Sequence, residues 1–263
     1  MLKAAIDQTN KKDHLCTEKK LYKNLRKYFK NHISGKLSPF IISSPLLDRF
    51  VINFDHSIYR DFKWWDAFSL GIIKTIYKNK SGPIVKMGNH YIGADKFEHL
   101  FGRGFKYFEK YYLKGQSLNR IFKFGYRSEK IFLGANTTGV FSYADLSANF
   151  NGMRFWNNVL GKHPDILGLN IEPYVKCINQ QWTLNNSIDF LHYIDDSFDE
   201  AINCSKFRTK KLLSKVKKQI RRLEQGSDKK YSCPINSHSI SGLLEKYHGF
   251  EKELFNFEGH QSL

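Results

Sequence analysis

The sequence predicts a mainly α-helical protein: a single helical globular domain with a few short strands or hairpins and irregular loops. Three observations support this prediction. Large apolar residues recur at steps of three and four, which is the periodicity of a helix with one buried face. Only 6 prolines occur in 263 residues, which suits long helices. Aromatic residues make up 15% of the chain, so large rings should dominate the core.

The clearest helix is predicted from Asp95 to Tyr112, where phenylalanines follow one another at helical spacing. Ser142 has the residue type and position of an N-cap, and we expect it to begin a helix that runs to about Val159. Other helices are expected at 60–78, 117–130, 187–203, 206–224 and 240–255, with strands or hairpins at 50–54, 84–92 and 174–178.

Charge divides the chain into three predicted parts. The net charge is +17, but residues 1–36 carry ten Lys/Arg against three acids, and residues 205–230 carry eleven against two. We therefore predict a basic N-terminal arm at 1–36, a core helical domain at 37–204 and a basic helical C-terminal extension at 205–263. An anionic partner, nucleic acid or a membrane surface, is the interaction that residues 206–222 would favour.

Apolar runs and cysteines bear on the compartment. No apolar run approaches the ~20 residues of a membrane span, and the N-terminus lacks a signal-peptide pattern. We therefore expect a cytoplasmic protein, or one exported without a recognisable signal peptide. The four cysteines form no CxxC pair. Export would allow a disulfide among Cys177, Cys204 and Cys233, whereas in the cytosol they, like Cys16, would be reduced.

Two of the predicted helices carry polar residues at the same spacing, Asp-x3-His/Asn-x2-Gly. These residues are Asp95, His99 and Gly102 in the first helix, and Asp145, Asn149 and Gly152 in the second. At 100° per residue each set shares one face. Because glycine lets two helices approach closely, the two polar faces could converge in one slot.

Such a slot could bind a divalent metal ion through Asp95, His99 and Asp145, since carboxylates and imidazole are suitable ligands. The same groups, joined by Glu129 near the end of the intervening helix, could act as catalytic acids and bases, because crowded carboxylates separate one another's pKa values. The structural alternative is that these residues cap helices or lock two helices together.

Further residues around the slot are candidates for substrate binding by charge or by hydrogen bonding. They are Arg103, Arg127, Thr138, Tyr143 and Asn149. Elsewhere the sequence has no GxGxxG, Walker, HExxH or GxSxG motif. The acidic residues Asp195, Asp196, Asp199 and Glu200 are interpreted as a solvated face or as an intramolecular partner of the basic segment 206–222.

Three segments resemble a family of uncharacterised bacterial proteins, many of them exported. They are DKFEHLFG at 95–102, TTGVFSYADL at 137–146 with Asn149 and Gly152 after it, and DEAINC at 199–204. The resemblance covers about residues 60–205. It implies a bacterial origin and a true domain, but no reaction.

Two functions follow as hypotheses. The first is a metal-assisted hydrolase acting on a phosphoester or a cell-envelope polymer at the slot between the two helices. The second is a non-enzymatic bacterial effector or interaction protein that uses its basic flanks to bind nucleic acid or an anionic membrane surface.

Overall fold

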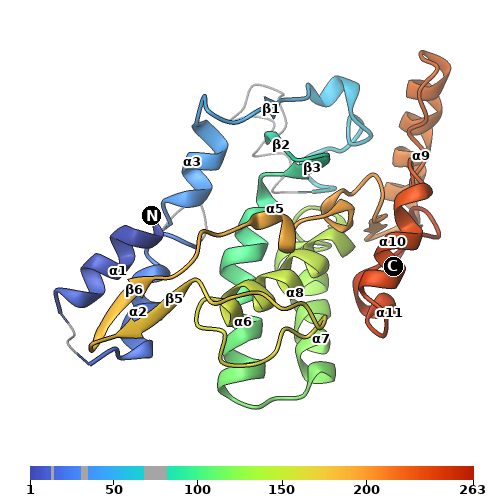
Figure 1. Cartoon of the computed structure of the whole chain (residues 1–263). Helices are drawn as coiled ribbons and strands as arrows, with labels where there is room; N and C mark the ends of the chain where they lie inside the picture. The colour runs from blue at the N-terminus through green and yellow to red at the C-terminus, as the bar shows by residue number, and fades with distance from the viewer. Residues whose placement is uncertain (13–14, 31–34, 68–81) are drawn as a thin grey trace. The chain divides into compact units, whose positions relative to one another are not determined.

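The structure is a computed structural model that describes residues 1–12, 15–30, 35–67 and 82–263 (Figure 1). Helix accounts for 46% of the described residues and strand for 10%, so the mainly helical fold class is confirmed. The chain forms two compact units, each built from several separate segments of the sequence. The first unit comprises residues 1–47, 97–117 and 148–194, and the second comprises residues 48–96, 118–147 and 195–263.

The N-terminal segment contributes two packed helices to the first unit, α1 (Leu2–Asn10) and α2 (Glu18–Leu25). Ala5 and Leu21 are completely buried. A disulfide joins Cys16, between the two helices, to Cys177 of the hairpin formed by β5 (Val175–Ile178) and β6 (Gln181–Leu184). Residues 1–36, predicted as an arm, thus belong to the first unit, and α3 (Leu37–Ser43) follows them.

The predicted helix at 95–112 is present and alternates between α- and π-helical turns. Its successive segments are α5 (Asp95–Glu98), the π-helical η2 (His99–Arg103), α6 (Gly104–Phe108) and the π-helical η3 (Glu109–Leu113). The phenylalanines at 97, 101, 105 and 108 are all buried, as their spacing predicts. π-Helical turns are uncommon and often occur at functional sites.

Two glycines let helices of the first unit approach closely. α8 (Tyr143–Asn158) contains Gly152, where an added Cβ would lie 2.0 Å from the Leu100 carbonyl oxygen. At Gly104 an added Cβ would lie 2.4 Å from the Cα of Gly152. Close approach through glycine is therefore confirmed for Gly152, but its partner is Gly104. Gly102, the predicted partner, has open space around it.

The described residues of the second unit form two small sheets. β1 (Arg49–Phe50), β2 (Ile84–Met87) and β3 (His90–Gly93) pair antiparallel in that order, which confirms the hairpin expected at 84–92. In the other sheet, β4 (Val140–Phe141) pairs antiparallel with β7 (Lys206–Phe207), and β7 pairs parallel with β8 (Gln261–Ser262). The helical elements of the second unit include η1 (Phe54–His56), α7 (Leu118–Arg127), η4 (Ser128–Leu133), η6 (Asp196–Phe198), α9 (Lys210–Gln225), α10 (His238–Lys246) and α11 (Glu251–Leu254).

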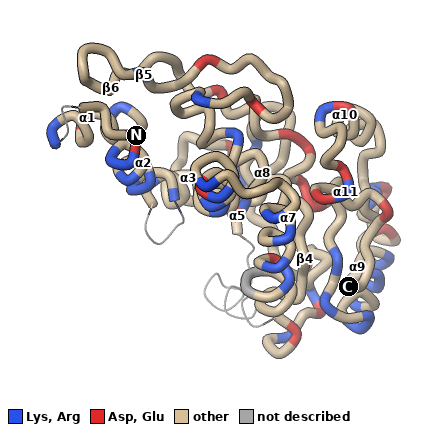
Figure 2. Tube along the Cα trace, turned by 90° about the horizontal axis from the view of Figure 1, so that it is seen from below, with Lys and Arg blue, Asp and Glu red and all other residues tan. Residues whose placement is uncertain are grey.

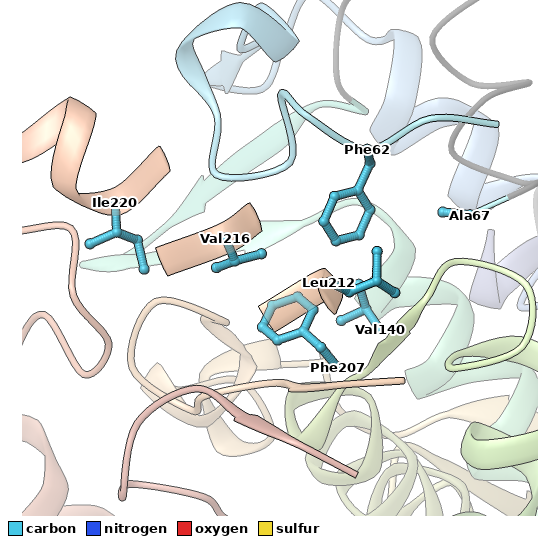
Figure 3. Packing of buried hydrophobic residues seen from close by; sticks show 7 residues of the cluster. All are labelled: Phe62, Ala67, Val140, Phe207, Leu212, Val216 and Ile220. Atoms are coloured by element: carbon cyan, nitrogen blue, oxygen red, sulfur yellow. The ribbon is translucent and has the colours of Figure 1, made fainter. Parts of the chain in front are cut away.

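One apolar cluster of the second unit forms under α9 (Figure 3). Leu212, Val216 and Ile220 of this helix recur at steps of four and face Phe62 and Phe207. The amphipathic helix predicted at 206–224 is therefore confirmed, with its start shifted to Lys210. Thr209 caps it by accepting a hydrogen bond from the Leu212 N–H at 3.2 Å.

Two of the predicted helices are wrong in part or in full. The segment 187–203 contains only short 3₁₀ turns, η5 (Phe190–His192) in the first unit and η6 in the second. The Asp189 and Asp195 side chains accept hydrogen bonds from backbone N–H groups two residues ahead, which competes with helix formation. Residues 60–67 form turns instead of the start of a helix, and the remainder of that prediction lies outside the described residues.

The helix predicted at 240–255 is divided into α10 and α11. Gly249 lies between them with a φ of +87°, a left-handed conformation that ends helices.

A second disulfide, Cys204–Cys233, joins the segment before β7 to the segment after α9. The alternative with a disulfide among the three C-terminal cysteines is therefore correct for this pair, whereas Cys177 bonds to Cys16.

Candidate functional site

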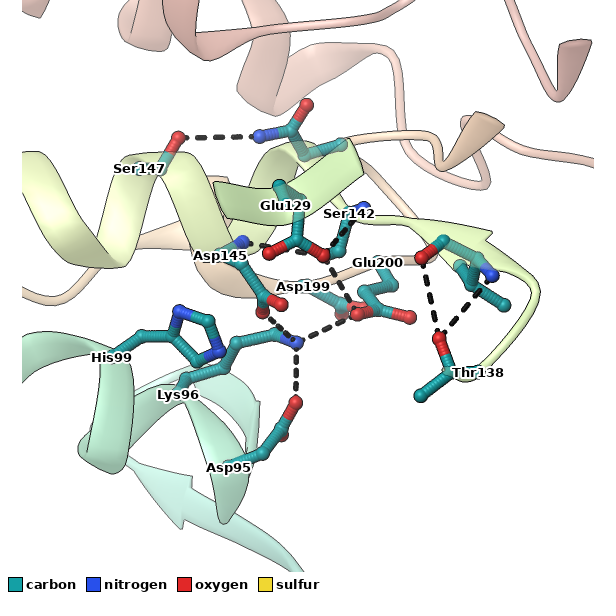
Figure 4. A network of polar contacts seen from close by, with 12 residues as sticks. Asp95, Lys96, His99, Glu129, Thr138, Ser142, Asp145, Ser147, Asp199 and Glu200 are labelled. Atoms are coloured by element: carbon teal, nitrogen blue, oxygen red, sulfur yellow. Dashed lines mark hydrogen bonds and ion pairs between the residues drawn. The ribbon is translucent and has the colours of Figure 1, made fainter. Parts of the chain in front are cut away.

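A buried lysine, Lys96, forms the centre of a polar cluster in the second unit (Figure 4). Only 2% of its side chain is exposed. Its Nζ donates hydrogen bonds to Asp95 Oδ2 at 2.8 Å, to Asp145 Oδ1 at 2.6 Å and to Glu200 Oε1 at 2.6 Å. These carboxylates hold the pKa of Lys96 well above its usual range against the opposing effect of burial. Lys96 is therefore a charged ammonium group with three ionic partners.

Asp145 is positioned by the first turn of α8. The predicted N-cap is confirmed, because the Ser142 side-chain oxygen accepts a hydrogen bond from the Asp145 N–H at 3.2 Å. The same Ser142 hydroxyl donates to Glu200 Oε1 at 2.8 Å. Ser142 therefore caps the start of the helix and also orients the Glu200 carboxylate, which is distant in the sequence.

Glu200 belongs to this cluster around Lys96, although the sequence interpretation assigned it to an acidic run with Asp195, Asp196 and Asp199. Besides Lys96 and Ser142, it accepts a hydrogen bond from the Tyr59 hydroxyl at 3.3 Å. The other three members of the acidic run also have partners. Asp196 pairs with His90 and Asp195 with Lys246, each at 2.5 Å, and Asp199 accepts a hydrogen bond from the Ala201 N–H at 2.8 Å. The interpretation of this run as a solvated face or a partner of the basic segment was therefore wrong.

Glu129 lies in the π-helical η4 and is almost completely buried. Its Oε1 accepts from the Ser142 N–H at 3.4 Å. Burial, together with the nearby Asp145 carboxylate, raises the pKa of the Glu129 carboxyl group well above its usual range. Gly134 makes room for this side chain, since a Cβ there would lie 2.0 Å from Glu129 Oε1.

Three carboxylates of the cluster lie close enough together to bind one divalent cation, and the Lys96 ammonium group already contacts one oxygen of each. Asp95, Asp145 and Glu200 each offer one carboxylate oxygen within 4.8 Å of the others. Oxygen ligands that lie 2.0–2.6 Å from one ion are separated by no more than about 5 Å. The Asp95 side chain is 60% exposed, whereas that of Asp145 is 10% exposed, so solvent reaches the cluster beside Asp95.

His99 and Asn149 lie in the first unit, where they form the pair that the matched spacing predicts. The His99 Nδ1 and Asn149 Oδ1 atoms are 3.1 Å apart. Asn149 is buried, and His99 is half-buried on η2. That His99 also contributes a ligand to a metal ion stays a prediction.

The remaining predicted substrate-binding residues have varied surroundings. Thr138 donates a hydrogen bond to the Gly134 carbonyl oxygen at 2.9 Å and so stabilises its own loop. Tyr143 is buried and packs against Phe141 with ring centroids 5.3 Å apart. Arg127 is exposed at the end of α7, and Arg103 is half-buried on η2 in the first unit. Their roles in binding a substrate stay predictions.

Sequence reasoning missed Lys96, Glu200 and Tyr59. Lys96 had a usable signal, because it directly follows a candidate ligand and lies outside both basic flanks. Glu200 and Tyr59 had none, since neither lies on the two helices whose spacing matched. Their approach to the cluster depends on tertiary structure.

Comparisons of the chain with protein families, with curated proteins and with solved structures give no match. None of the helices in the described residues is long and apolar enough to cross a membrane.

Proposed function

We propose that the cluster around Lys96 is the centre of a metal-assisted hydrolase. The observation that carries this proposal is the convergence of Asp95, Asp145 and Glu200, whose oxygens lie within ion-binding distance of one another. Carboxylate oxygens are the ligands that Mg²⁺, Mn²⁺ and Ca²⁺ prefer in proteins. The helical spacing of the sequence predicts a nitrogen ligand, His99, for the same ion.

Charge supports a cation at this position. Three carboxyl groups surround the single positive charge of Lys96. An excess of acidic groups over basic ones attracts a further cation from solvent. A divalent ion would neutralise the excess and would lower the pKa of a bound water molecule, which generates a nucleophile at neutral pH.

Glu129 is the proposed general acid of this site. Its raised pKa keeps the carboxyl group protonated above the pH at which an ordinary glutamate ionises. Two neighbouring carboxyl groups with separated pKa values can divide the roles of acid and base between them. The protonated Glu129 would donate to the leaving group, while an ionised carboxylate accepts a proton from water.

The two disulfides favour a compartment outside the cytoplasm, because cytosolic thiols are kept reduced. The resemblance of 95–102, 137–146 and 199–204 to a bacterial family with exported members points the same way. We therefore propose an exported hydrolase whose substrate is a phosphoester or a cell-envelope polymer, held by Arg103, Arg127 and Asn149. Thr138 and Tyr143 would support the surrounding loop and helix.

Metal binding tests the proposal directly. The oxidised full-length chain is titrated with Mn²⁺ and Zn²⁺ by isothermal calorimetry, and hydrolysis of bis(p-nitrophenyl) phosphate is followed with each metal. We expect one ion per chain and hydrolysis that requires it. Asp95→Asn should weaken binding at least about tenfold, which equals about 1.4 kcal/mol.

The matched control is Asp228→Asn, an exposed aspartate of the same unit, which should bind like the unaltered chain. Asp95 is a better test position than Asp145, because 60% of its side chain is exposed, against 10% for Asp145. Absence of a bound ion, or equal affinity in Asp95→Asn and Asp228→Asn, would contradict the metal site.

A second function is favoured by one observation on α9. Its buried face packs on the apolar cluster, while Lys210, Lys211, Lys217, Lys218 and Arg221 are exposed. At 100° per residue these five fall within an arc of about 120°. Figure 2 shows the basic residues along this helix. The alternative function is thus an effector or interaction protein whose α9 binds nucleic acid or an anionic membrane surface.

A further inference from the structure

The first unit contains a cavity of about 820 Å³ beside α2. This α2 cavity is lined on one side by residues 18–30 and on the other by residues of α6 and η3. Its size is within the range of sites that enclose small organic ligands, about 300–1,000 Å³. None of the residues proposed for the hydrolase lines it, so it is a separate feature of the molecule.

The polar lining of the α2 cavity is predominantly cationic. Six cations line it against two carboxylates: Lys19, Lys23, Arg26, Lys27, Lys30 and Lys114 against Glu18 and Glu109. Figure 2 shows the basic residues that follow one another along α2.

Both carboxylates are already neutralised. Lys162 pairs with Glu18, and Lys106 and Lys114 pair with Glu109 at 3.2 and 3.1 Å. Among the residues that the structure describes, Lys19, Lys23 and Arg26 form no salt bridge. The cavity therefore offers uncompensated positive charge to a ligand.

Arg26 gives an independent indication of a missing acceptor. Its Nε is buried and, among the described residues, has no hydrogen-bond partner. The guanidinium carbon lies 4.3 Å from the centroid of the Phe105 ring, so the side chain is held in place over an aromatic face. A buried donor without an acceptor is unfavourable, so the Arg26 guanidinium lacks one of the hydrogen bonds that would satisfy it.

The rest of the lining is apolar. Tyr22 and Phe105 are buried residues of the lining, and Leu113 is an exposed leucine at the same cavity. Lysine side chains add their methylene stems to such a surface while their ammonium groups remain in water. Because Arg26 covers the face of Phe105, this apolar surface suits a flexible aliphatic chain better than a stacked aromatic ring.

We propose that the α2 cavity binds an amphiphilic anion, a molecule with one aliphatic chain and a phosphate or carboxylate head group. The head group would contact Arg26 and Lys23, and the chain would lie against Tyr22, Phe105 and Leu113. The cavity has both cationic and apolar lining residues. It therefore favours an amphiphilic anion over a free polar anion, which would leave the apolar surface exposed.

Calorimetry with the oxidised full-length chain tests the class of ligand. Dodecyl phosphate and dodecanoate, each kept below its micelle concentration, are the positive probes, and their comparison identifies the preferred head group. Neutral dodecyl maltoside, dodecyltrimethylammonium and inorganic phosphate are the controls. We expect saturable one-to-one binding of at least one anionic probe, and at least tenfold weaker binding of all three controls.

A matched pair of charge reversals tests the location. Lys23→Glu lies in the cavity lining and Lys20→Glu lies on the same helix outside it, and both variants lower the net charge equally. Lys23→Glu should weaken binding of the anionic probe at least tenfold, whereas Lys20→Glu should stay within twofold. Arg26→Gln should also weaken binding, with its fold checked by circular dichroism. Because Lys23 is exposed, its substitution should leave the fold intact.

Each alternative result overturns the proposal in a different way. Equal binding of dodecyl maltoside would mean that only an apolar surface is recognised. Equal binding of inorganic phosphate would mean that only charge is recognised. Equal weakening by Lys20→Glu and Lys23→Glu would mean that binding depends on diffuse positive charge. Absence of binding by both anionic probes would remove the site altogether.

Discussion

Lys96 determines how the carboxylates of the second unit coexist. A buried ammonium group with three carboxylate partners is strongly coupled to all of them, because the interior screens charge poorly. Removing one member of a buried ion cluster leaves the others uncompensated, which costs more than the cluster contributes to folding. The structural role of Lys96 and the proposed metal site therefore depend on the same oxygen atoms.

Lys96→Met is expected to lower the free energy of unfolding by about 3–5 kcal/mol at neutral pH, since it leaves three carboxylates without their cation. Urea denaturation measures this loss. Mn²⁺ should restore part of it, because a ligand that binds only the folded chain stabilises it. Lys106→Met removes a more exposed lysine that pairs with Glu109, and should cost no more than about 1 kcal/mol. Loss of equal size in both variants would contradict the central role of Lys96.

Single residues also show where sequence reasoning reaches its limit. Asp145 could be predicted because helical spacing and an N-cap place it on one face. The Lys96–Glu200 contact could not, because it joins residues 104 positions apart and depends on how a loop folds back. Glu129 was predicted from its position near the loop, but its π-helical surroundings have no sequence signal that periodicity can detect.

At the scale of elements, the matched spacing on the two helices correctly predicted the polar contact between them but named the wrong glycine for their close approach. The His99–Asn149 contact formed as expected. The close approach uses Gly104 instead of Gly102, because the π-helical turn of η2 changes which positions share a face. An argument at 100° per residue assumes a regular helix and fails where a wider turn intervenes.

The two glycines of the matched motif therefore give opposite predictions. Gly152→Ala should destabilise the chain by about 1–3 kcal/mol or more, because the new Cβ meets backbone atoms that cannot move independently. Gly102→Ala should be neutral or stabilising by up to about 1 kcal/mol, since the space is open and alanine favours helix. Thermal and urea denaturation of both variants measure the difference. The reverse order, or equal effects, would contradict the packing described for the first unit.

At the scale of the whole molecule, composition predicted the fold class but not the covalent framework. Abundant aromatic residues and helical periodicity were sufficient to indicate a mainly helical protein. Disulfide pairing is not readable from spacing alone, because four cysteines allow three connectivities. Cys16–Cys177 spans 161 residues and ties the predicted arm into the first unit, which a charge count over residues 1–36 could not reveal.

The basic charge of the chain leads to a prediction about α9. If its exposed face binds an anionic surface, affinity should fall steeply with salt, because each neutralised phosphate releases a counterion. Binding to duplex DNA and to vesicles containing phosphatidylglycerol is measured from about 50 to 300 mM KCl, a range over which such binding weakens strongly. A triple variant, Lys217→Gln, Lys218→Gln and Arg221→Gln, should reduce the magnitude of the log–log salt slope for the true partner by about 2–3.

The matched control, Lys3→Gln, Lys11→Gln and Lys12→Gln, removes the same charge from exposed positions of the N-terminal segment and should leave the slope nearly unchanged. Equal slopes in the two triple variants would assign the binding to net charge rather than to α9, and a flat slope in the unaltered chain would exclude the interaction.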